Sequence, residues 1–376
     1  MGKPELRSRP GEAEDKGTSP RTLVERLRES TFGNWYRDRK YAENIREGRP
    51  YFNGPPKVQP VSRHSPSRLL QCHRRSWYNH LNSAEEDGLP QGIFWFGTRF
   101  EEDLIMPFLS DKITNKETYA CNSLWVDYTV DTDHGEIRIK GETDPVIVDE
   151  DSVPLLLLEV KTKQSVDGLS EPNQHHRAQL HAYIHGLSEK YDTDLERAVI
   201  VYGSRSTLET EVFEVEFDQA FWEDTVLQWA ADQTKYRTYG ALPPAEPEHD
   251  WECKFCSYRE RCGRGDREYS DSGPVGLLPI FSDYPRQSVV EYLDSHPDSK
   301  LTPTLAHNHP SLVENYGAYD WSCSACEATY SWNEIDPPSS SHAPRCPECR
   351  ENGEKGWLSG PTPDEQLRIE GADDVQ

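Results

Sequence analysis

The apolar residues in the middle of the chain change between helical and strand-like spacing. From Phe94 to Leu109, apolar residues recur at positions that share one face of a helix, which predicts an amphipathic helix. The continuous apolar run from Pro154 to Val160 ends in charged residues, as is typical of a strand buried in the middle of a sheet. The same patterns predict further strands at 124–130, 136–148, 198–202 and 211–217, and helices near 67–78 and at 173–187 and 219–239. This order predicts an α/β domain whose mixed sheet is flanked by helices.

The two ends of the chain have a more polar pattern than the middle. The first segment is charged and rich in Arg, Glu, Gly and Pro, with a helical pattern only around Leu23 to Leu27. We therefore expect five parts: a partly ordered polar extension (1–58), a domain (59–268), a linker with one short helix near Val289 (269–310), a compact unit bearing Cys and Trp (311–360) and an acidic tail (361–376).

The composition narrows the class of protein. The 376 residues include 66 acidic and 41 basic ones, giving a net charge of −25, and only 14 of the basic residues are lysine. An acidic surface poor in lysine is expected of a protein that stays soluble in concentrated salt, and it argues against a non-specific nucleic-acid coat protein. No apolar run approaches the roughly 20 residues of a membrane span, and the first residues lack the apolar core of a signal peptide. We expect no membrane partner and a cytoplasmic location.

Eight of the nine cysteines fall into two sets of four. Disulfides are rare inside cells, so short spacings between cysteines indicate metal binding. The first set is compatible with a zinc site. The second has the spacing of a zinc ribbon around one tetrahedral Zn²⁺, a unit that can bind a protein partner or act as a structural cap. Cys121 is left over and is expected to be a buried apolar residue. The first set is Cys72, Cys253, Cys256 and Cys262, and the second is Cys323, Cys326, Cys346 and Cys349.

A carboxylate and a lysine end the predicted central strand. Glu159 and Lys161 are two apart and so share one face of the strand, while Val160 points to the other. Asp144 lies fifteen residues upstream in a neighbouring strand-like segment. Two carboxylates on one pocket bind Mg²⁺ or Mn²⁺, and the lysine adds a cation for a phosphate oxygen or positions the attacking water. The alternative is a simple ion pair at the surface end of a strand.

Three short motifs together resemble the PD-(D/E)XK nuclease superfamily, in particular its RecB-like branch. Gly141 to Asp144 matches a G-x-x-D segment, Glu159 to Lys161 matches E-x-K, and Gln179 with Tyr183 matches Q-x-x-x-Y on a helix face suited to contact a nucleic-acid backbone. The resemblance implies a restriction-endonuclease-like fold, with Asp144, Glu159 and the intervening Val160 at the metal. It implies catalytic roles for Lys161, Gln179 and Tyr183.

Two further features belong to this resemblance. The branch usually has a histidine ligand four residues after a glycine on the preceding helix. In this chain the residue four after Gly97 is Glu101, and Glu102 follows it. We favour Glu101 as the ligand. One cysteine before the core and three after it are similar to the iron–sulfur members, such as AddB-type nuclease domains and CRISPR-associated RecB-like exonucleases. This implies a 4Fe–4S cluster on the first cysteine set, which would close a loop of about 190 residues.

A basic and aromatic cluster surrounds the first cysteine. Arginine binds phosphate and aromatic rings stack on unpaired bases, so the cluster is a candidate surface for single-stranded DNA. The alternative is that its arginines pair with the abundant carboxylates. The cluster consists of Arg63, His64, Arg68, His73, Arg74, Arg75, Trp77 and Tyr78.

The expected function is that of a metal-dependent DNA nuclease. The resemblance favours an exonuclease on single-stranded DNA ends, acting in CRISPR adaptation or in DNA end processing and repair. The competing hypothesis is a weak or inactive nucleic-acid- or protein-binding module on the same scaffold, which the missing histidine favours. A zinc-dependent transcription regulator has little support, because no recognition-helix pattern accompanies the ribbon.

Overall fold

The computed structural model describes residues 20–29, 32–55, 57–88, 91–267, 269, 271, 273–336 and 343–372. The chain divides into two units, Met1–Pro56 and Lys57–Gln376. In the first unit, α1 (Pro20–Glu29) and α2 (Phe32–Arg46) are followed by a 3₁₀ turn (Pro50–Asn53). The side chain of Asn53 donates to the carbonyl oxygen of Tyr41 (3.0 Å) and so ties this turn to α2. The expected polar extension is therefore helical over residues 20–29 and 32–46, and its residues 1–19, 30, 31 and 56 lie outside the described part.

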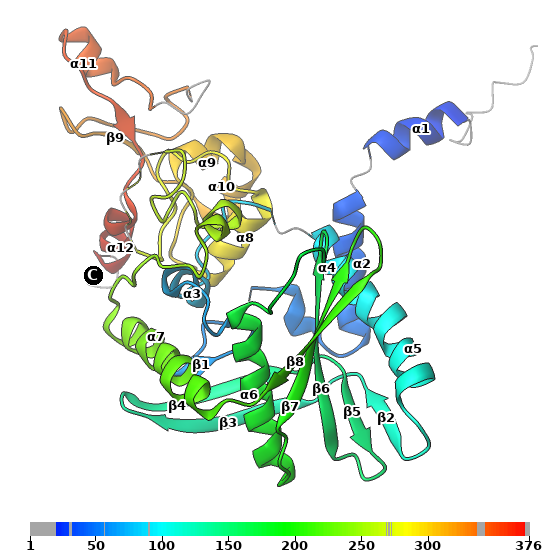
Figure 1. Cartoon of the computed structure of the whole chain (residues 1–376). Helices are drawn as coiled ribbons and strands as arrows, with labels where there is room; N and C mark the ends of the chain where they lie inside the picture. Colours follow the sequence, from blue (N-terminus) through cyan, green and yellow to red (C-terminus); the bar gives the residue numbers. More distant parts are fainter. Residues whose placement is uncertain are drawn as a thin grey trace, which may run out of the picture. The chain divides into compact units, whose positions relative to one another are not determined.

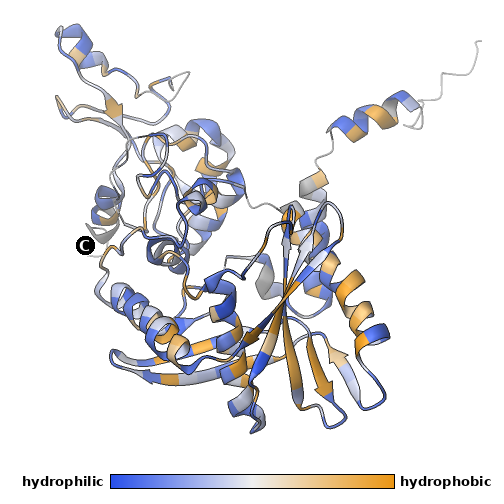
Figure 2. Cartoon of the chain, in the orientation of Figure 1, coloured by the Kyte–Doolittle hydropathy of each residue, from blue (hydrophilic) through white to orange (hydrophobic). Residues whose placement is uncertain are grey.

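A five-stranded mixed sheet lies at the centre of the second unit (Figure 1). Its strands are ordered β2 (Thr118–Cys121), β5 (Val146–Asp149), β6 (Pro154–Lys163), β7 (Arg197–Ser204) and β8 (Thr210–Glu216). Strands β6 and β7 are parallel, and the other neighbouring pairs are antiparallel. Figure 2 shows hydrophobic residues concentrated along the middle strands. The apolar run predicted as the central strand is β6, and the predicted mixed α/β fold is confirmed.

Helices cover both faces of this sheet. On one face, α6 (Gln174–Tyr191) connects the parallel strands and buries Leu180 and Ile184 against Leu157 and Ile200. On the other face, Phe100, Ile105 and Leu109 pack against Leu158 and Val160. Those three residues belong to a helix formed by α4 (Gln91–Phe100), a π-helical turn (Glu101–Ile105), α5 (Met106–Phe108) and a second π-helical turn (Leu109–Ile113). Glu159 and Lys161 alternate with Val160, and therefore they point to the α6 side.

The segment predicted as a strand pair or one long bent strand over 136–148 is divided between two sheets. Strand β4 (Gly135–Glu142) pairs with β3 (Trp125–Thr132) and β1 (Arg63–His64) in a separate three-stranded sheet, whereas β5 belongs to the main sheet. Residues Val226 and Ala230, at the start of the long helix that ends as α7 (Gln228–Tyr239), pack on this smaller sheet. The break between the two sheets places Asp144 between β4 and β5.

The short helix predicted near Val289 is present at Arg286–Ser295, but the described residues of 269–310 do not form the predicted linker. Three helices, α8 (Arg286–Ser295), α9 (Pro303–Asn308) and α10 (Pro310–Tyr316), bury a hydrophobic core of their own. Their apolar residues, with Leu277 and Leu278, are too irregularly spaced to show this in the sequence. The expected acidic tail is also packed here through α12 (Pro363–Ala372), and its last residues, 373–376, lie outside the described part. No helix that the structure describes is both long and apolar enough to cross a membrane.

Gln366 of α12 is the polar residue that docks the end of the chain. It is 1% exposed, accepts from the N–H of Leu277 (2.9 Å) and donates to the carbonyl oxygens of Leu277 and Pro361 (both 2.8 Å). Replacing Gln366 by alanine leaves these backbone groups buried without partners. We expect Gln366→Ala to lower the free energy of unfolding in urea by about 2–4 kcal/mol. Leu367→Ala, at a neighbouring exposed position, is the control; equal losses in the two variants would contradict this role.

Candidate active site and cysteine sites

Three residues predicted for the metal site come together where β6 ends. Glu159 is fully buried, and the ammonium of Lys161 donates to its Oε1. The second oxygen of Glu159, Oε2, has no hydrogen-bond partner. Asp144 reaches the same strand, because its Oδ2 accepts from the backbone N–H of Val160 (2.7 Å). Val160 itself contributes its backbone here, while its side chain packs on the opposite face of the sheet.

When all of them are ionised, Asp144, Glu159 and Lys161 carry two negative charges and one positive charge. Burial is the main cause that raises the pKa of Glu159, to about 8 in all; Lys161 opposes the shift and Asp144 adds to it. Burial would lower the pKa of Lys161, but Glu159 and Asp144 outweigh it and raise that pKa. Without a bound cation, the carboxyl groups of such a cluster retain protons at neutral pH.

Of the two candidate replacements for the histidine, the structure brings Glu101 to the site. Burial, with the nearby charge of Asp144, raises the pKa of Glu101 to about 7 against the opposing effect of Lys161. Glu102 points elsewhere and pairs with Arg99 (3.2 Å). Glu101 begins a π-helical turn, a local widening that often occurs at functional sites and that no sequence pattern predicts.

Gln179 and Tyr183 support the site from α6. Both are nearly fully buried, Gln179 donates to the hydroxyl of Tyr183 (3.2 Å), and Tyr183 donates to the carbonyl oxygen of Glu142 (2.7 Å). Nε2 of Gln179 and the hydroxyl of Tyr183 are therefore engaged inside the protein, and contact of these two residues with a nucleic-acid backbone stays a prediction. They fix the backbone two residues before Asp144. Gly141 is needed on the same segment, since a Cβ there would lie 2.7 Å from Cδ of Pro66.

The residues at this site fit a hydrated divalent cation. The unpartnered oxygen of Glu159 is a buried acceptor that a cation would satisfy. The oxygens of Glu101, Asp144 and Glu159 do not all lie within 4.8 Å of one another. Mg²⁺ tolerates this, because it usually keeps several waters and binds only one or two carboxylates directly.

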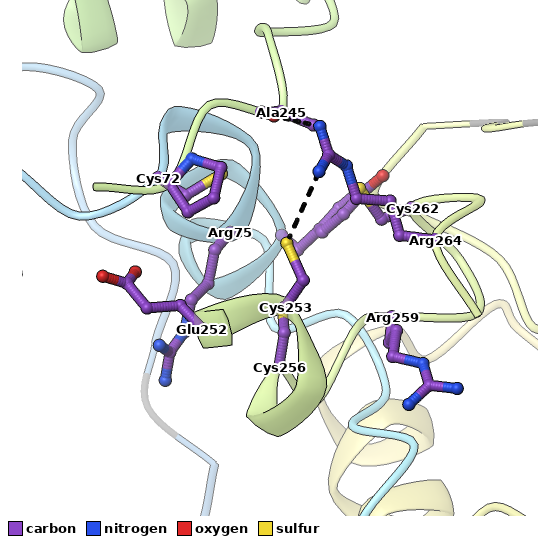
Figure 3. Close-up of a pocket in the computed structure, with 11 residues that line it drawn as sticks. Cys72, Arg75, Ala245, Glu252, Cys253, Cys256, Arg259, Cys262 and Arg264 are labelled. Carbon is purple, nitrogen blue, oxygen red and sulfur yellow. Dashed lines mark hydrogen bonds between the residues drawn. The ribbon is translucent and has the colours of Figure 1, made fainter. Parts of the chain in front are cut away.

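The first cysteine set lines one cavity. Cys72 at the start of α3 (His73–His80) and the three later cysteines surround about 420 Å³ of empty space, part of it open to solvent (Figure 3). No three of their sulfurs lie within 4.8 Å of one another. Burial raises the pKa of Cys256 to about 11, so binding of a metal group here must release protons.

Two arginines donate to sulfurs of this cavity. Nη1 of Arg74 lies 3.8 Å from Sγ of Cys262, and Nη1 of Arg264 lies 3.8 Å from Sγ of Cys253. Figure 3 shows Arg264 reaching from this sulfur to the carbonyl oxygen of Ala245. Hydrogen bonds to sulfur and nearby positive charge are the features that stabilise an anionic metal–thiolate group, so the residues fit one.

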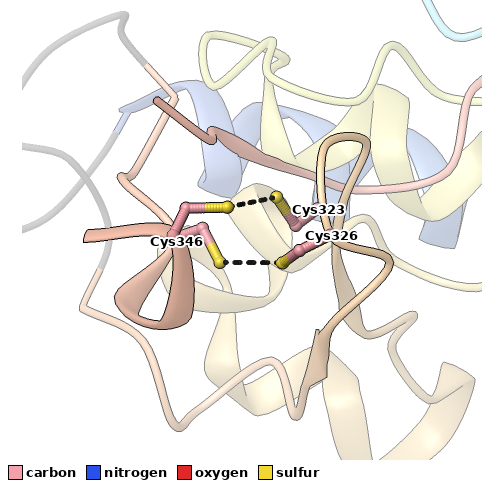
Figure 4. Close-up of side chains that lie close together, drawn as sticks. Cys323, Cys326 and Cys346 are labelled. Carbon is pink, nitrogen blue, oxygen red and sulfur yellow. Dashed lines mark hydrogen bonds between the residues drawn. The ribbon is translucent and has the colours of Figure 1, made fainter. Parts of the chain in front are cut away.

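The second cysteine set is much tighter. The sulfurs of Cys323 and Cys349 are 3.7 Å apart, those of Cys326 and Cys346 are 3.6 Å apart, and all four lie within 4.8 Å of one another (Figure 4). Strands β9 (Trp321–Cys323), β10 (Thr329–Tyr330) and β11 (Leu358–Ser359) and helix α11 (Pro347–Glu351) frame the group. Such a four-cysteine group can bind zinc or an iron centre.

Most of the predicted basic and aromatic cluster is used inside the protein. Arg74 pairs with Asp271 (3.1 Å), and Trp77 and Tyr78 are buried with Tyr258, so their rings cannot stack on bases. The imidazoles of the cluster are also engaged: His64 contacts Thr234 (2.8 Å) and His73 contacts Gln233 (2.7 Å). The prediction that the rings of Trp77 and Tyr78 stack on bases is therefore wrong, and Arg74 follows the alternative of pairing with a carboxylate. Among the described residues of the cluster, the guanidinium groups of Arg68 and Arg75 make no hydrogen bond or ion pair, and these residues bond only through their backbone.

Sequence reasoning missed two residues beside the site. His175 lies four residues before Gln179 and thus on the same face of α6; that spacing could have revealed it. Glu248 lies next to it, with its Oε2 3.6 Å from Nδ1 of His175. No local pattern marks Glu248, since tertiary folding alone brings it to α6.

The chain belongs to the PD-(D/E)XK nuclease superfamily, whose profile matches residues 40–263. Members of this superfamily are typically metal-dependent nucleases that act on nucleic acids. No curated protein matches the chain. Among solved structures, the crystal structure of SSO0001 is similar, with 18% sequence identity and a TM-score of 0.41, and the match covers 62% of this chain and 96% of that one. At this level the likeness is weak, and the assignment depends on the superfamily match.

The raised pKa of Glu159 makes the stability of the metal-free protein depend on pH. The unfolded chain loses this proton near pH 4.5, whereas the folded protein keeps it up to about pH 8. Stability is therefore lost as the pH rises through this window. In EDTA, we expect the free energy of unfolding of the wild type to fall, relative to Glu159→Gln, by about 2–4 kcal/mol between pH 5 and pH 8. Glu102→Gln is the control and should follow the wild type; parallel curves for Glu159→Gln and wild type would contradict the buried-proton assignment.

Proposed function

We propose that this chain is a metal-dependent DNA nuclease whose active site is formed by Glu101, Asp144, Glu159 and Lys161. The observation that carries the proposal is the buried, unpartnered Oε2 of Glu159 beside two further carboxylates and one ammonium. A divalent cation at such carboxylates lowers the pKa of bound water and neutralises charge on a phosphodiester. The superfamily assignment makes DNA the substrate class that this arrangement serves.

The protein side chains have separate tasks in this proposal. Asp144 and Glu159 provide carboxylate ligands, with the backbone of Val160 fixing Asp144. Lys161 provides a positive charge at the substrate phosphate and orients the attacking water. Gln179 and Tyr183 act as positioning residues through the carbonyl oxygen of Glu142.

The RecB-like iron–sulfur branch is the proposed place of this chain within the superfamily. The wide spacing of Cys72, Cys253, Cys256 and Cys262 supports a 4Fe–4S cluster over a single zinc ion, because a cluster of four irons holds its cysteine ligands farther apart. Arg74 and Arg264 would offset the negative charge of the cluster. The proposed nuclease domain extends over residues 59–268.

The second cysteine set is proposed to bind one zinc ion. Four sulfurs placed about 2.3 Å from a tetrahedral Zn²⁺ lie about 3.8 Å apart, close to the spacing of Cys323 with Cys349 and of Cys326 with Cys346. The unit around them is small, so the metal would supply much of its folding energy. A protein partner is the proposed ligand of its surface, since arginine and lysine are scarce between Cys323 and Cys349.

The proposed reaction is exonucleolytic digestion of single-stranded DNA ends, in CRISPR adaptation or in DNA end processing. Arg75 supports the binding of a single DNA strand, because its guanidinium lines the cysteine cavity and has no hydrogen bond or ion pair among the described residues. The second candidate is an inactive binding module on the same scaffold. The absence of the usual histidine favours it, while the approach of Glu101 to Asp144 and Lys161 favours an active site.

A digestion assay tests the catalytic assignment. With Mn²⁺ and labelled single-stranded DNA, we expect Lys161→Ala and Asp144→Ala each to lower the rate at least about a hundredfold, because the first removes a positive charge at the phosphate and the second removes a carboxylate ligand of the cation. Lys140→Ala is the matched control and should retain wild-type activity, because Lys140 of β4 pairs with Asp127 of β3 (2.8 Å). If all four proteins digest DNA equally, the assignment is wrong; if none does, the binding module is favoured.

A glycine tests the proposed zinc site. A Cβ at Gly356 would lie 2.8 Å from Cβ of Cys349 and 2.9 Å from Sγ of Cys323, closer than real contacts allow. We expect Gly356→Ala to lose most of the roughly one zinc per chain that a Cys₄ site holds, measured by elemental analysis. The exposed neighbour variant Lys355→Ala should keep its zinc. Full zinc content in Gly356→Ala would exclude this packing against the cysteines.

A further inference from the structure

Residues 241–249, here called the strap, join the end of α7 to the helical turn Asp250–Phe255 that carries Cys253. The strap has no regular secondary structure, so it depends on side chains to hold it. Arg74 is one of these: its Nε donates to the carbonyl oxygen of Pro243 (2.8 Å), and its Nη1 donates to Sγ of Cys262 (3.8 Å). A single guanidinium therefore links the strap to a cysteine sulfur.

Arg264 repeats this arrangement from a different part of the chain. Its Nη2 donates to the carbonyl oxygen of Ala245 (2.7 Å) and its Nη1 to Sγ of Cys253 (3.8 Å). The sulfur of a metal-bound cysteine is anionic and accepts hydrogen bonds more strongly than the sulfur of a free thiol. Occupation of the cysteine cavity therefore strengthens both links and holds the strap more firmly.

The far end of the strap caps α6. Oε1 of Glu248 accepts from the backbone N–H of Gln174 (3.3 Å), and Oε2 pairs with Nδ1 of His175 (3.6 Å). The first N–H groups of a helix have no partner within it, and a carboxylate there also interacts favourably with the helix dipole. Asn173, the residue preceding α6, makes no capping hydrogen bond through its side chain, so Glu248 takes that role. Its side chain is only 20% exposed, which limits screening by solvent.

The capped helix is the one that supports the nuclease site. Farther along α6, Gln179 and Tyr183 hold the backbone next to Asp144. The start of α6 also lies at the end of β6, since Nζ of Lys163 is 3.4 Å from Oδ1 of Asn173. A shift of the first turn of α6 therefore moves groups that position the carboxylates.

We propose that Glu248 is a positioning residue of the nuclease site, held in place through the strap by the metal group of the first cysteine set. This rests on the proposed function. Loading of the cysteine cavity strengthens the contacts of Arg74 and Arg264 to sulfur, which keep the strap and Glu248 against α6. Loss of the group loosens the strap, frees the first turn of α6 and lowers activity without any change in the residues of the active site.

Hydrogen exchange of the peptide spanning residues 172–180 tests this coupling directly. Iron- and sulfide-reconstituted protein is compared with protein stripped by a chelator, for the wild type, Glu248→Gln and Glu171→Gln. Glu171 is an exposed residue of the same polar pocket as Glu248, and its substitution removes the same charge. In the wild type, we expect stripping to raise exchange about fivefold, the effect of losing an N-terminal cap.

The variants distinguish coupling from simple capping. Glu248→Gln loses the carboxylate charge that pairs with His175 and favours the start of α6, so it should exchange about three- to fivefold faster even when loaded, with little further change on stripping. Glu171→Gln should behave as the wild type. Exchange that is independent of loading in the wild type overturns the proposal, as does an unchanged response to stripping in Glu248→Gln.

The nuclease assay adds a second readout on loaded protein. Glu248→Gln should lower kcat several-fold with KM and the visible absorbance of the cluster unchanged, and Glu248→Asp should recover part of the loss. Full kcat in Glu248→Gln overturns the positioning role. If the wild type is inactive but its exchange depends on loading, the proposed function is wrong. If the wild type is active but its exchange does not depend on loading, only this inference is wrong.

Discussion

The charge balance at the end of β6 is the constraint on which the proposed activity depends. Glu159 is buried without contact to water, and Lys161 satisfies only one of its two oxygens. Asp144 and Glu101 add further negative charge nearby, so the metal-free site keeps excess protons. A divalent cation relieves the same imbalance, and for this reason a site that is costly to fold alone suits a metal-dependent reaction.

Tertiary packing holds these buried charged side chains in place. Val160 anchors the strand on one face of the sheet through the helix that carries Glu101, while α6 covers the other face and fixes the backbone beside Asp144 through Tyr183. Each proposed ligand therefore comes from a different part of the chain, and hydrophobic packing on both faces of the sheet holds these parts in place. Such rigid support is what a preorganised catalytic site requires.

The two cysteine sets differ in the size of the group they suit, although both contain a C-x-x-C pair. The sulfurs from Cys323 to Cys349 converge closely on one point, whereas Cys72 and its three partners surround an open cavity bordered by arginines. The compact set joins short local strands, and the open set joins α3 to a segment some 180 residues later in the chain. In the proposed assignment, the compact second set stabilises a small unit. The open first set ties together elements that also contact the proposed nuclease site.

Local patterns in the sequence predicted the elements with strong periodicity and the residues that belong to short motifs. The apolar run of β6, the helix of Gln179 and Tyr183, and the two C-x-x-C pairs of the second cysteine set each act within a few residues, so backbone geometry alone relates their members. The separation of β4 from β5, the core of α8 to α10 and the burial of Trp77 depend on contacts between distant segments, and no local spacing encodes them. The spacing from Gly97 already favoured Glu101, and the structure agrees with it by placing Glu101 near Asp144 and Lys161. The approach of Glu248 to α6, in contrast, was decided only by the tertiary structure, because it depends on where separate elements pack.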